Sequence, residues 1–309
     1  MSTIFEVRDP EFHAVIPKSA NLETLVTGLK FGEGPIWHPF ENELIFSDII
    51  ASVQYRWSEA NGGSIFRRPS NMANGNAFDH HGNVLSCEHA TSRVVRHDYS
   101  GKAVDTIASH FDGKTLNSPN DICCDADGRV YFTDPDFGRT RKDVGRPREV
   151  ELSHRGVYCL DTSLANSPLR LGNSTFQQPN GLCLSPNDGA LYVNDSADPC
   201  IRVFDVSGDE WTGGEVWSRV EGEAGPRPKW VPDGLKISND GYVFCNGPGG
   251  VYVYAPDARC LGAILFPQKS TNFCFAGPTR EELIVTTSTT VYRIATNTSG
   301  PPMIPGAPA

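Results

Sequence analysis

The feature of this sequence that most restricts its fold is a strand–turn–strand pattern that recurs along the chain. In its clearest copy, Asn120-Asp121 opens a short apolar run, a turn follows at residues 125–128, and a second apolar run ends at Asp134. This spacing of strands and turns, repeated at intervals of 39 to 60 residues, is typical of the blades of a β-propeller. The six copies open at Glu33, Asn74, Asn120, Asn180, Asp233 and Asn272. We therefore predict an all-β, six-bladed β-propeller with a central channel.

The repeats also set the domain boundaries. We predict that the propeller spans residues 22–295, and that residues 24–26 form a strand that completes the last blade and closes the ring. We expect residues 1–21 to form an irregular N-terminal arm, and the Pro-, Gly- and Ala-rich residues 296–309 to form a disordered tail. The longest insertion, Phe137–Arg155, is either a lid over the channel mouth or a solvated surface loop.

Composition limits the partners and the compartment. The net charge of −10 argues against a nucleic acid or an anionic membrane surface as the main partner. No apolar run approaches the ~20 residues that cross a bilayer, and no basic, apolar start is present. The nine cysteines include no C-x-x-C pair and are expected to be reduced thiols in the core. We expect a cytoplasmic protein, monomeric or a small homo-oligomer.

The opening residues of the repeats predict a metal site. Equivalent positions on the inner strands of a propeller form a ring around its channel, and Glu33, Asn120, Asn180 and Asp233 offer only oxygen ligands there. Such a set suits a divalent metal, Ca²⁺ first, with Mg²⁺, Mn²⁺ or Zn²⁺ as alternatives. Four protein ligands would leave room for water and a substrate oxygen. The competing interpretation is that Asn-Gly and Asp-Gly pairs are ordinary turn residues.

Other polar residues have more than one interpretation. Asn74 and Asn272 occupy the remaining ring positions, either as groups that contact the metal's ligands or the substrate, or simply as residues that start a strand. His89 follows the inner strand pair of the second repeat and either faces the channel mouth or is a structural histidine. Three carboxylates that follow inner strand pairs could support the ligands, bind substrate or cap turns: Asp134, Asp136 and Asp195.

Several short motifs together resemble one family. They are G-E-G-P at residues 32–35, S-P-N-D at 118–121, F-T-D-P at 132–135, Q-P-N-G at 178–181 and P-D-G-L at 232–235, with C-E-H at 87–89. Over residues 22–295 the sequence resembles the SMP-30 (regucalcin), gluconolactonase and luciferin-regenerating enzyme family, and its microbial gluconolactonase branch more than animal regucalcin. The resemblance implies a six-bladed propeller with one divalent metal.

The resemblance also implies roles for particular residues. Glu33, Asn180 and Asp233 would be metal ligands, with Asn120 as a fourth ligand or a neighbour that binds substrate. In regucalcin an arginine that binds sugar hydroxyls stands where this chain has Ser118, so the resemblance leaves the substrate open.

The predicted activity is metal-assisted hydrolysis of a lactone, the small-molecule partner, with sugar lactones such as glucono-1,5-lactone first. Asp233 would be the catalytic base, with hydroxide on the metal as the alternative, and Asn120, Asn74 and His89 would bind substrate. A phosphotriesterase using the same metal site is a second interpretation. A third is a non-catalytic calcium-binding propeller that presents its faces to a protein partner.

Overall fold

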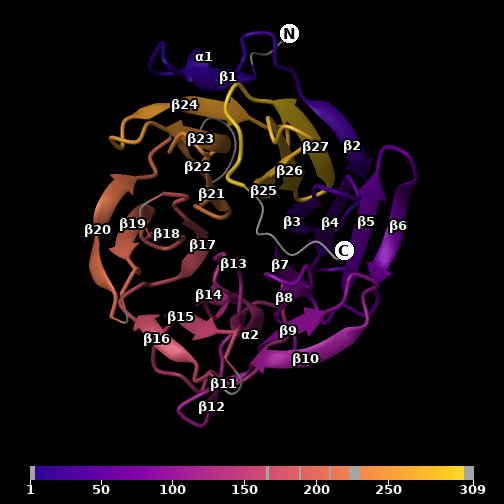
Figure 1. Cartoon of the computed structure of the whole chain (residues 1–309), viewed down its shortest axis with the longest axis vertical. Helices are drawn as coiled ribbons and strands as arrows, with labels where there is room; N and C mark the ends of the chain where they lie inside the picture. The colour runs from indigo at the N-terminus through magenta and orange to yellow at the C-terminus, as the bar shows by residue number, and fades with distance from the viewer. Residues whose placement is uncertain (1–3, 165–166, 188, 209, 223–229, 303–309) are drawn as a thin grey trace.

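Six antiparallel sheets are arranged in a ring around a central axis in the computed structural model (Figure 1). The structure describes residues 4–164, 167–187, 189–208, 210–222 and 230–302. In each blade the chain starts beside the axis and runs outward strand by strand, over four consecutive strands in the first five blades and over three in the sixth. The prediction of an all-β, six-bladed β-propeller is confirmed.

The blades follow one another along the chain. The strands of the first three blades are β3 (Gly32–His38), β4 (Glu43–Asp48), β5 (Val53–Ser58) and β6 (Gly62–Arg67); β7 (Ala73–Phe78), β8 (Val84–Glu88), β9 (Arg93–His97) and β10 (Ala103–Ala108); and β13 (Ile122–Cys124), β14 (Arg129–Asp134), β15 (Gly156–Asp161) and β16 (Arg170–Asn173). A short hairpin lies between the second and third blades, formed by β11 (His110–Phe111) and β12 (Lys114–Thr115).

The strands of the last three blades are β17 (Pro179–Leu184), β18 (Ala190–Asp195), β19 (Cys200–Asp205) and β20 (Thr212–Arg219); β21 (Leu235–Ile237), β22 (Val243–Gly247), β23 (Gly250–Tyr254) and β24 (Cys260–Leu265); and β25 (Ser270–Ala276), β26 (Glu282–Thr287) and β27 (Thr290–Ala295). A strand from the N-terminal part of the chain, β2 (Glu23–Thr27), completes the sixth blade. Its residues Glu23 and Thr24 pair with Arg293 and Tyr292 of β27. The expected closing strand is therefore confirmed.

Burial follows the position of a strand in its blade. All seven residues of the innermost strand β3 are buried, whereas β6, at the outer edge of the same blade, is mostly exposed. The apolar core lies between neighbouring blades rather than in one centre. In one cluster, for example, Leu85 and Val94 of the second blade pack with Val130 and Tyr158 of the third. Each blade covers the apolar face of the next, as layered β-architectures require.

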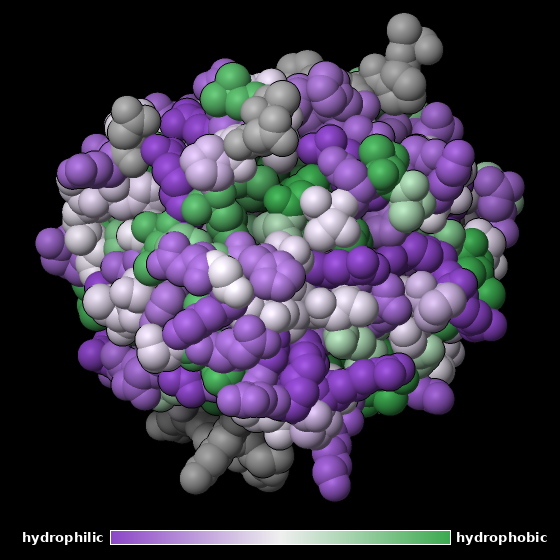
Figure 2. All heavy atoms as spheres, turned by 90° about the horizontal axis from the view of Figure 1, so that it is seen from below, coloured by the Kyte–Doolittle hydropathy of each residue, from purple (hydrophilic) through white to green (hydrophobic). Residues whose placement is uncertain are grey.

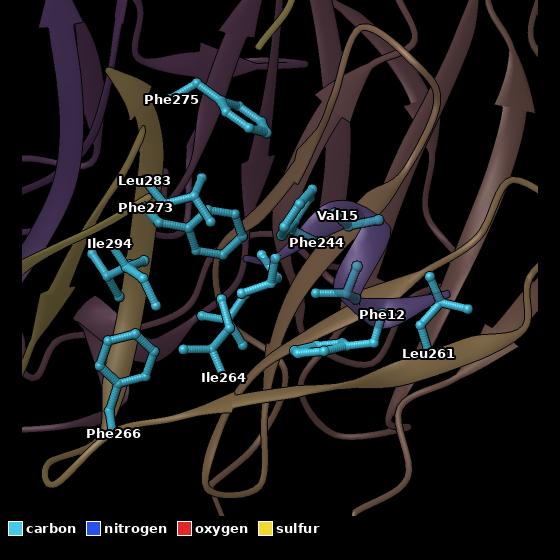
Figure 3. Packing of buried hydrophobic residues seen from close by; sticks show 14 of the residues in the cluster. Phe12, Val15, Phe244, Leu261, Ile264, Phe266, Phe273, Phe275, Leu283 and Ile294 are labelled. Carbon is cyan, nitrogen blue, oxygen red and sulfur yellow. The ribbon is translucent and has the colours of Figure 1, made fainter. Parts of the chain in front are cut away.

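The N-terminal arm is more ordered than the sequence suggested. Strand β1 (Phe5–Val7) pairs with β24 as a fifth strand of the fifth blade, and the one-turn helix α1 (Phe12–Val15) follows it. Phe12 and Val15 are fully buried, and Figure 3 shows them among core side chains of the last two blades, near Phe244 and Leu261. The expectation of an irregular arm was wrong because two apolar side chains one turn apart are too few to give a readable periodicity.

The start of the C-terminal tail is also held in place. The backbone N–H of Thr296 donates to the carbonyl of Glu281 at 2.8 Å, and that of Gly300 donates to the carbonyl of Arg280 at 2.9 Å. The expectation of a disordered tail therefore fails for residues 296–302, whose hydrogen bonds a compositional argument could not foresee. Residues 303–309 lie outside the described residues.

The surface and the cysteines agree with the compositional analysis. The flank of the ring in Figure 2 presents mostly hydrophilic side chains, between which smaller groups of hydrophobic ones show. All nine cysteines are free thiols, and most are buried. Within the described ranges, no helix has the length and apolar character needed to span a membrane.

Candidate active site

A pocket of about 50 Å³ lies where the inner strands begin, at one mouth of the channel. In five of the six repeats the opening residue lies in the pocket wall, either within the inner strand or just before it. The structure brings together the six residues that the sequence analysis proposed as metal ligands, catalytic base or substrate-binding groups: Glu33, Asn74, His89, Asn120, Asn180 and Asp233. Each of them is at least nine-tenths buried. A ring of carboxylates and amides, as the repeats predicted, therefore lines this mouth.

Glycines after the opening residues allow the inner strands to approach closely. A Cβ on Gly181 would lie 2.1 Å from the carbonyl oxygen of Asp233 on the next blade, and one on Gly75 would lie 2.5 Å from that of Asn120. The N–H groups of the same glycines donate to those carbonyls, at 3.0 and 2.8 Å. The Asn-Gly pairs are thus not turns, which was the competing interpretation. They allow backbone contact between blades at the site.

Polar side chains on the second strand of a blade hold the opening residue of the next blade in place. Each donates a hydrogen bond to the carbonyl of the opening residue on the next blade. The pairs are Ser47 with Asn74 at 2.8 Å, Thr133 with Asn180 at 2.8 Å, and Asn194 with Asp233 at 2.6 Å. The opening residues are therefore held by the sheet framework rather than by loops, which favours a rigid site.

The charges in the pocket are unbalanced. Glu33 and Asp233 are 2% and 6% exposed, and Lys269 is the cation that contacts either of them, with Nζ 2.7 Å from Asp233 Oδ2. Burial raises the pKa of Glu33 well above its usual value, and repulsion from Asp233 adds to the effect. Burial also raises the pKa of Asp233, against the opposing effect of Lys269. The pair therefore favours either a proton or an added cation.

Amide groups complete the oxygen-rich side of the pocket. The Asn180 side-chain N–H donates to Ser196 Oγ at 3.0 Å, and the same side chain hydrogen-bonds to Asp233, which lowers the pKa of that carboxyl. Asn120 lies beside them in the pocket wall. Among the described residues, no group of three or more His, Cys, Asp or Glu side chains could hold a metal. The predicted ligand set contains two carboxylates and two amides, so it depends on amide oxygens.

His89 and Asn74 form a pair with a defined hydrogen-bond direction. His89 Nδ1 lies 2.8 Å from the carbonyl of Val144, which can only accept, so Nδ1 carries the proton. Nε2 then accepts from Asn74 Nδ2 at 3.2 Å. Burial lowers the pKa of His89 to about 4, which keeps the ring neutral. His89 thus orients the Asn74 amide.

The long insertion covers this mouth. Its helix α2 (Phe137–Thr140) and the residues after it place Phe137, Arg141 and Val144 in the pocket wall. Arg139, only 3% exposed, anchors the insertion with hydrogen bonds from Nε and Nη2 to the carbonyl of Leu116, at 3.1 and 2.7 Å. Of the two interpretations of Phe137–Arg155, the structure supports a cover over the channel mouth rather than a loop in solvent.

Ser118 does not face the pocket. It is fully buried, its hydroxyl donates to the carbonyl of Pro135 at 2.5 Å and accepts from the N–H of Gly138 at 2.9 Å. Ser118 therefore holds the covering insertion in place through these two hydrogen bonds. The guanidinium in the pocket wall belongs to Arg141, about half exposed and paired with Asp143. The arginine that could contact a substrate is therefore in that insertion and not at the position of Ser118.

Asn272 is displaced by one residue from the ring position that the sequence assigned to it. The N–H of Gly234 donates to the carbonyl of Thr271, as the N–H of Gly181 donates to that of Asp233. Thr271 is therefore the true opening residue of the sixth blade. Asn272 Oδ1 lies deeper, 3.4 Å from Lys236 Nζ, and outside the pocket wall. The assignment was wrong because Asn272 has the same residue type as the opening residues Asn74, Asn120 and Asn180, whereas Thr271 does not.

The three carboxylates after inner strand pairs cap loops. Asp195 accepts from the N–H groups of Gln177 and Gln178, at 2.6 and 3.0 Å, and Asp134 Oδ2 accepts from that of Asn117 at 2.8 Å. Asp136 pairs with Arg155 and accepts from the side chain of Gln178. None of the three belongs to the pocket wall. Of the roles left open, turn capping is the one that the contacts support.

Several pocket residues were missed by sequence reasoning. Lys269 and Phe31 come from the segments just before the inner strands of the sixth and first blades, and Ser196 and Ile49 follow the ends of second strands. The signal was available, because such segments necessarily lie at the same mouth as the opening residues. Nothing in the residue types of these segments distinguished them from other loops.

The fold and the pocket together define a propeller with an acidic and amide-lined site at one channel mouth. The model of the SMP-30/Gluconolactonase/LRE-like region matches residues 31–289, and the chain belongs to this family. The predicted family is thereby confirmed.

Three relatives narrow the class of protein. A gluconolactonase of Zymomonas mobilis is 31% identical over 94% of this chain and 85% of its own length. A pentonolactonase, XacC of Haloferax volcanii, is 26% identical over 85% of this chain and 83% of its own. The solved gluconolactonase XC5397 of Xanthomonas campestris superimposes with a TM-score of 0.86, at 28% identity over 94% of both chains. These relatives confirm the prediction that the chain is a lactonase.

Proposed function

We propose that this protein hydrolyses a sugar lactone to the aldonic acid, with a divalent cation held by Glu33, Asn120, Asn180 and Asp233. The observation that carries the proposal is the charge in the pocket: two buried carboxylates of raised pKa line it and repel each other, and among the described residues Lys269 forms an ion pair with only one of them. A divalent cation among these oxygens would remove that imbalance. Relatives that act on six- and five-carbon lactones, by their names, support the substrate class.

The donors fit a hard cation. Carboxylate and amide oxygens are the ligands that Ca²⁺ prefers, so Ca²⁺ is proposed first, with Mg²⁺, Mn²⁺ and Zn²⁺ as alternatives. When bound, such a cation would polarise the lactone carbonyl and stabilise the negative charge that develops on its oxygen.

The chain's own groups would handle the water and its proton. Asp233 is the proposed base: its carboxylate lies in the pocket wall, its pKa is raised by burial, and hydrogen bonds from Lys269 and Asn180 hold it in place. Asn180, bonded to both Ser196 and Asp233, would orient the carboxylate and the water. Asn120 would orient the lactone carbonyl.

The other side of the pocket would bind the sugar. His89 holds Asn74 through Nδ2, which leaves Oδ1 to accept from a substrate hydroxyl. Arg141 in the covering insertion would donate to hydroxyls, and Phe31 and Phe137 offer apolar faces to the ring. His89 itself is neutral and committed to two hydrogen bonds, so it positions Asn74 rather than transferring a proton.

The test is acid release in a pH-stat over a panel of aldonolactones, with EDTA and then Ca²⁺ added back. We expect EDTA to abolish release and Ca²⁺ to restore it, and Glu33→Gln and Asp233→Asn to lose both turnover and Ca²⁺ binding by calorimetry. Glu41→Gln, at an exposed glutamate of the same blade, is the matched control. Full turnover of Glu33→Gln without metal would refute the metal site. Hydrolysis of phosphotriesters instead of lactones would favour the second interpretation, and no hydrolysis of either would favour a binding protein.

A further inference from the structure

A second cavity lies at the opposite mouth of the channel, and we call it the distal pocket. It has a volume of about 220 Å³ and is lined by the far ends of all six inner strands and by Pro301 and Pro302. Its walls are largely apolar, with side chains such as Trp37, Phe78 and Phe275. Figure 1 shows the last described residues running from the rim toward the centre of the ring, which agrees with their place in the pocket wall.

A polar layer separates the distal pocket from the candidate active site. Lys236 Nζ lies 3.3 Å from Asp121 Oδ2 and 3.4 Å from Asn272 Oδ1, and donates to the carbonyl of Leu235 at 3.0 Å. The charge of Lys236 is therefore balanced by Asp121 inside the channel. None of these residues belongs to the active-site pocket, so the two cavities are distinct.

Arg280 brings a second, unbalanced positive charge to the distal pocket. It lies in the turn between β25 and β26, and its Nε and Nη1 atoms are shielded from solvent without a hydrogen-bond partner in the described part of the chain. No carboxylate within the described ranges forms an ion pair with it, and burial lowers the pKa of its guanidinium. An arginine cannot lose its proton, so its buried N–H groups require an acceptor.

Trp37 adds a second, independent donor. Its side chain is 7% exposed, and its indole Nε1 is buried without a partner among the described residues. Among the described side chains that line the distal pocket, the buried nitrogen and oxygen atoms without a partner are therefore N–H donors of Arg280 and Trp37, and none is a side-chain oxygen. Donors around an apolar cavity match an anionic acceptor attached to an apolar body.

We propose that the distal pocket binds a small organic monocarboxylate, whose carboxylate accepts from Arg280 and whose apolar body lies against the aromatic wall. The volume of the cavity limits the size of the ligand. Sites for drug-sized ligands measure roughly 300–1,000 Å³, and this cavity is smaller. A monocarboxylate with a single ring or a short chain is the matching class. Sugar acids, with a hydroxyl on each carbon, do not match these walls.

Benzoate is the probe for this proposal, titrated into the full chain by calorimetry. We expect saturable one-to-one binding, at least tenfold weaker in Arg280→Gln, and weaker again by severalfold when Trp37→Phe removes the indole donor. Arg280→Lys keeps the charge but not the planar fork, and is expected to fall between the two. Arg219→Gln, an exposed arginine of β20, is the matched control and should bind as the parent does. Lactone turnover should be unchanged in Arg280→Gln.

Several results would overturn the proposal. They are absence of binding at millimolar benzoate, equal affinity in Arg280→Gln, and equal affinity for the neutral isostere benzamide. Displacement of benzoate by an aldonolactone would place it in the active-site pocket instead. If a chain ended after Pro302 binds benzoate and the full chain does not, residues 303–309 supply the acceptor, and the pocket is not a ligand site.

Discussion

Replacing Gly181 with alanine would test whether the close approach of the inner strands positions the residues of the active site. The added Cβ would lie 2.1 Å from the carbonyl oxygen of Asp233 and 2.6 Å from the backbone N of Leu235. Real Cβ atoms essentially never approach closer than 3.0 Å, so the backbone at Asp233 must retreat by roughly 0.9 Å. Both neighbouring atoms belong to backbone inside the ring, so no flexible side chain can absorb the change.

Two consequences follow for Gly181→Ala. Overpacking of this kind destabilises a protein by about 1–3 kcal/mol. A displacement of about 1 Å of a catalytic group costs on the order of 100-fold in rate, and the proposed base is the residue displaced. We therefore expect a modest decrease in thermal stability together with a large loss of lactone turnover and of Ca²⁺ affinity.

The assays are thermal unfolding, calorimetric Ca²⁺ titration and pH-stat turnover on the same preparations. Gly63→Ala is the matched control, since a Cβ on that residue of the outer strand β6 meets no atom within 4 Å. It should behave as the parent in all three assays. If Gly181→Ala keeps full turnover and full Ca²⁺ affinity, the inner strands tolerate a wider spacing, and the reasoning about close approach fails.

Three further predictions concern the surroundings of the site. Burial raises the pKa of Asp134 to about 7, so its ionisation is disfavoured in the folded state. The free energy of unfolding should therefore fall by up to about 1.4 kcal/mol per pH unit as the pH rises from 4 to 7. Urea unfolding measured over this range should show a smaller fall for Asp134→Asn than for the parent. Arg139→Met should release the covering insertion and raise KM at least tenfold in steady-state assays, whereas Met at the exposed Arg146 should not. His89→Phe frees the Asn74 amide and should raise KM about tenfold. The pH profile of turnover above pH 5 should be unchanged, because the His89 ring is already neutral there. If the variant loses the acidic limb of that profile, His89 transfers a proton instead.

The propeller and most of its site could be predicted because both depend on local repeats. Strand–turn–strand units of similar length indicate blades, and a residue at a fixed phase in each unit must lie at one height around the channel. Five of the opening residues were therefore placed correctly, including Glu33 and Asp233. The sixth was placed one residue too late, since Thr271 and not Asn272 is the residue that the backbone places at that height.

Contacts between distant segments could not be predicted in the same way. Lys269, just before the sixth blade, contacts Asp233, just before the fifth, and the burial of Phe12 depends on a surface assembled from the last two blades. Ser118 left the substrate open in the sequence analysis because regucalcin has a sugar-binding arginine at that position. Its actual role depends on Gly138 in the insertion, which a one-dimensional pattern cannot place.

The closing strand has a consequence for how the protein is made. Glu23 of β2 pairs with Arg293 of β27, so the sixth blade joins segments separated by most of the chain. During translation, Glu33 and Asn74 leave the ribosome long before Asp233, and the ring cannot close until β27 has emerged. Contacts of such long sequence separation form late and slowly. A nascent chain that stops before residue 290 would thus leave β2 without its partner strand and the ring of inner strands open, so the enzyme should become active only after synthesis is nearly finished.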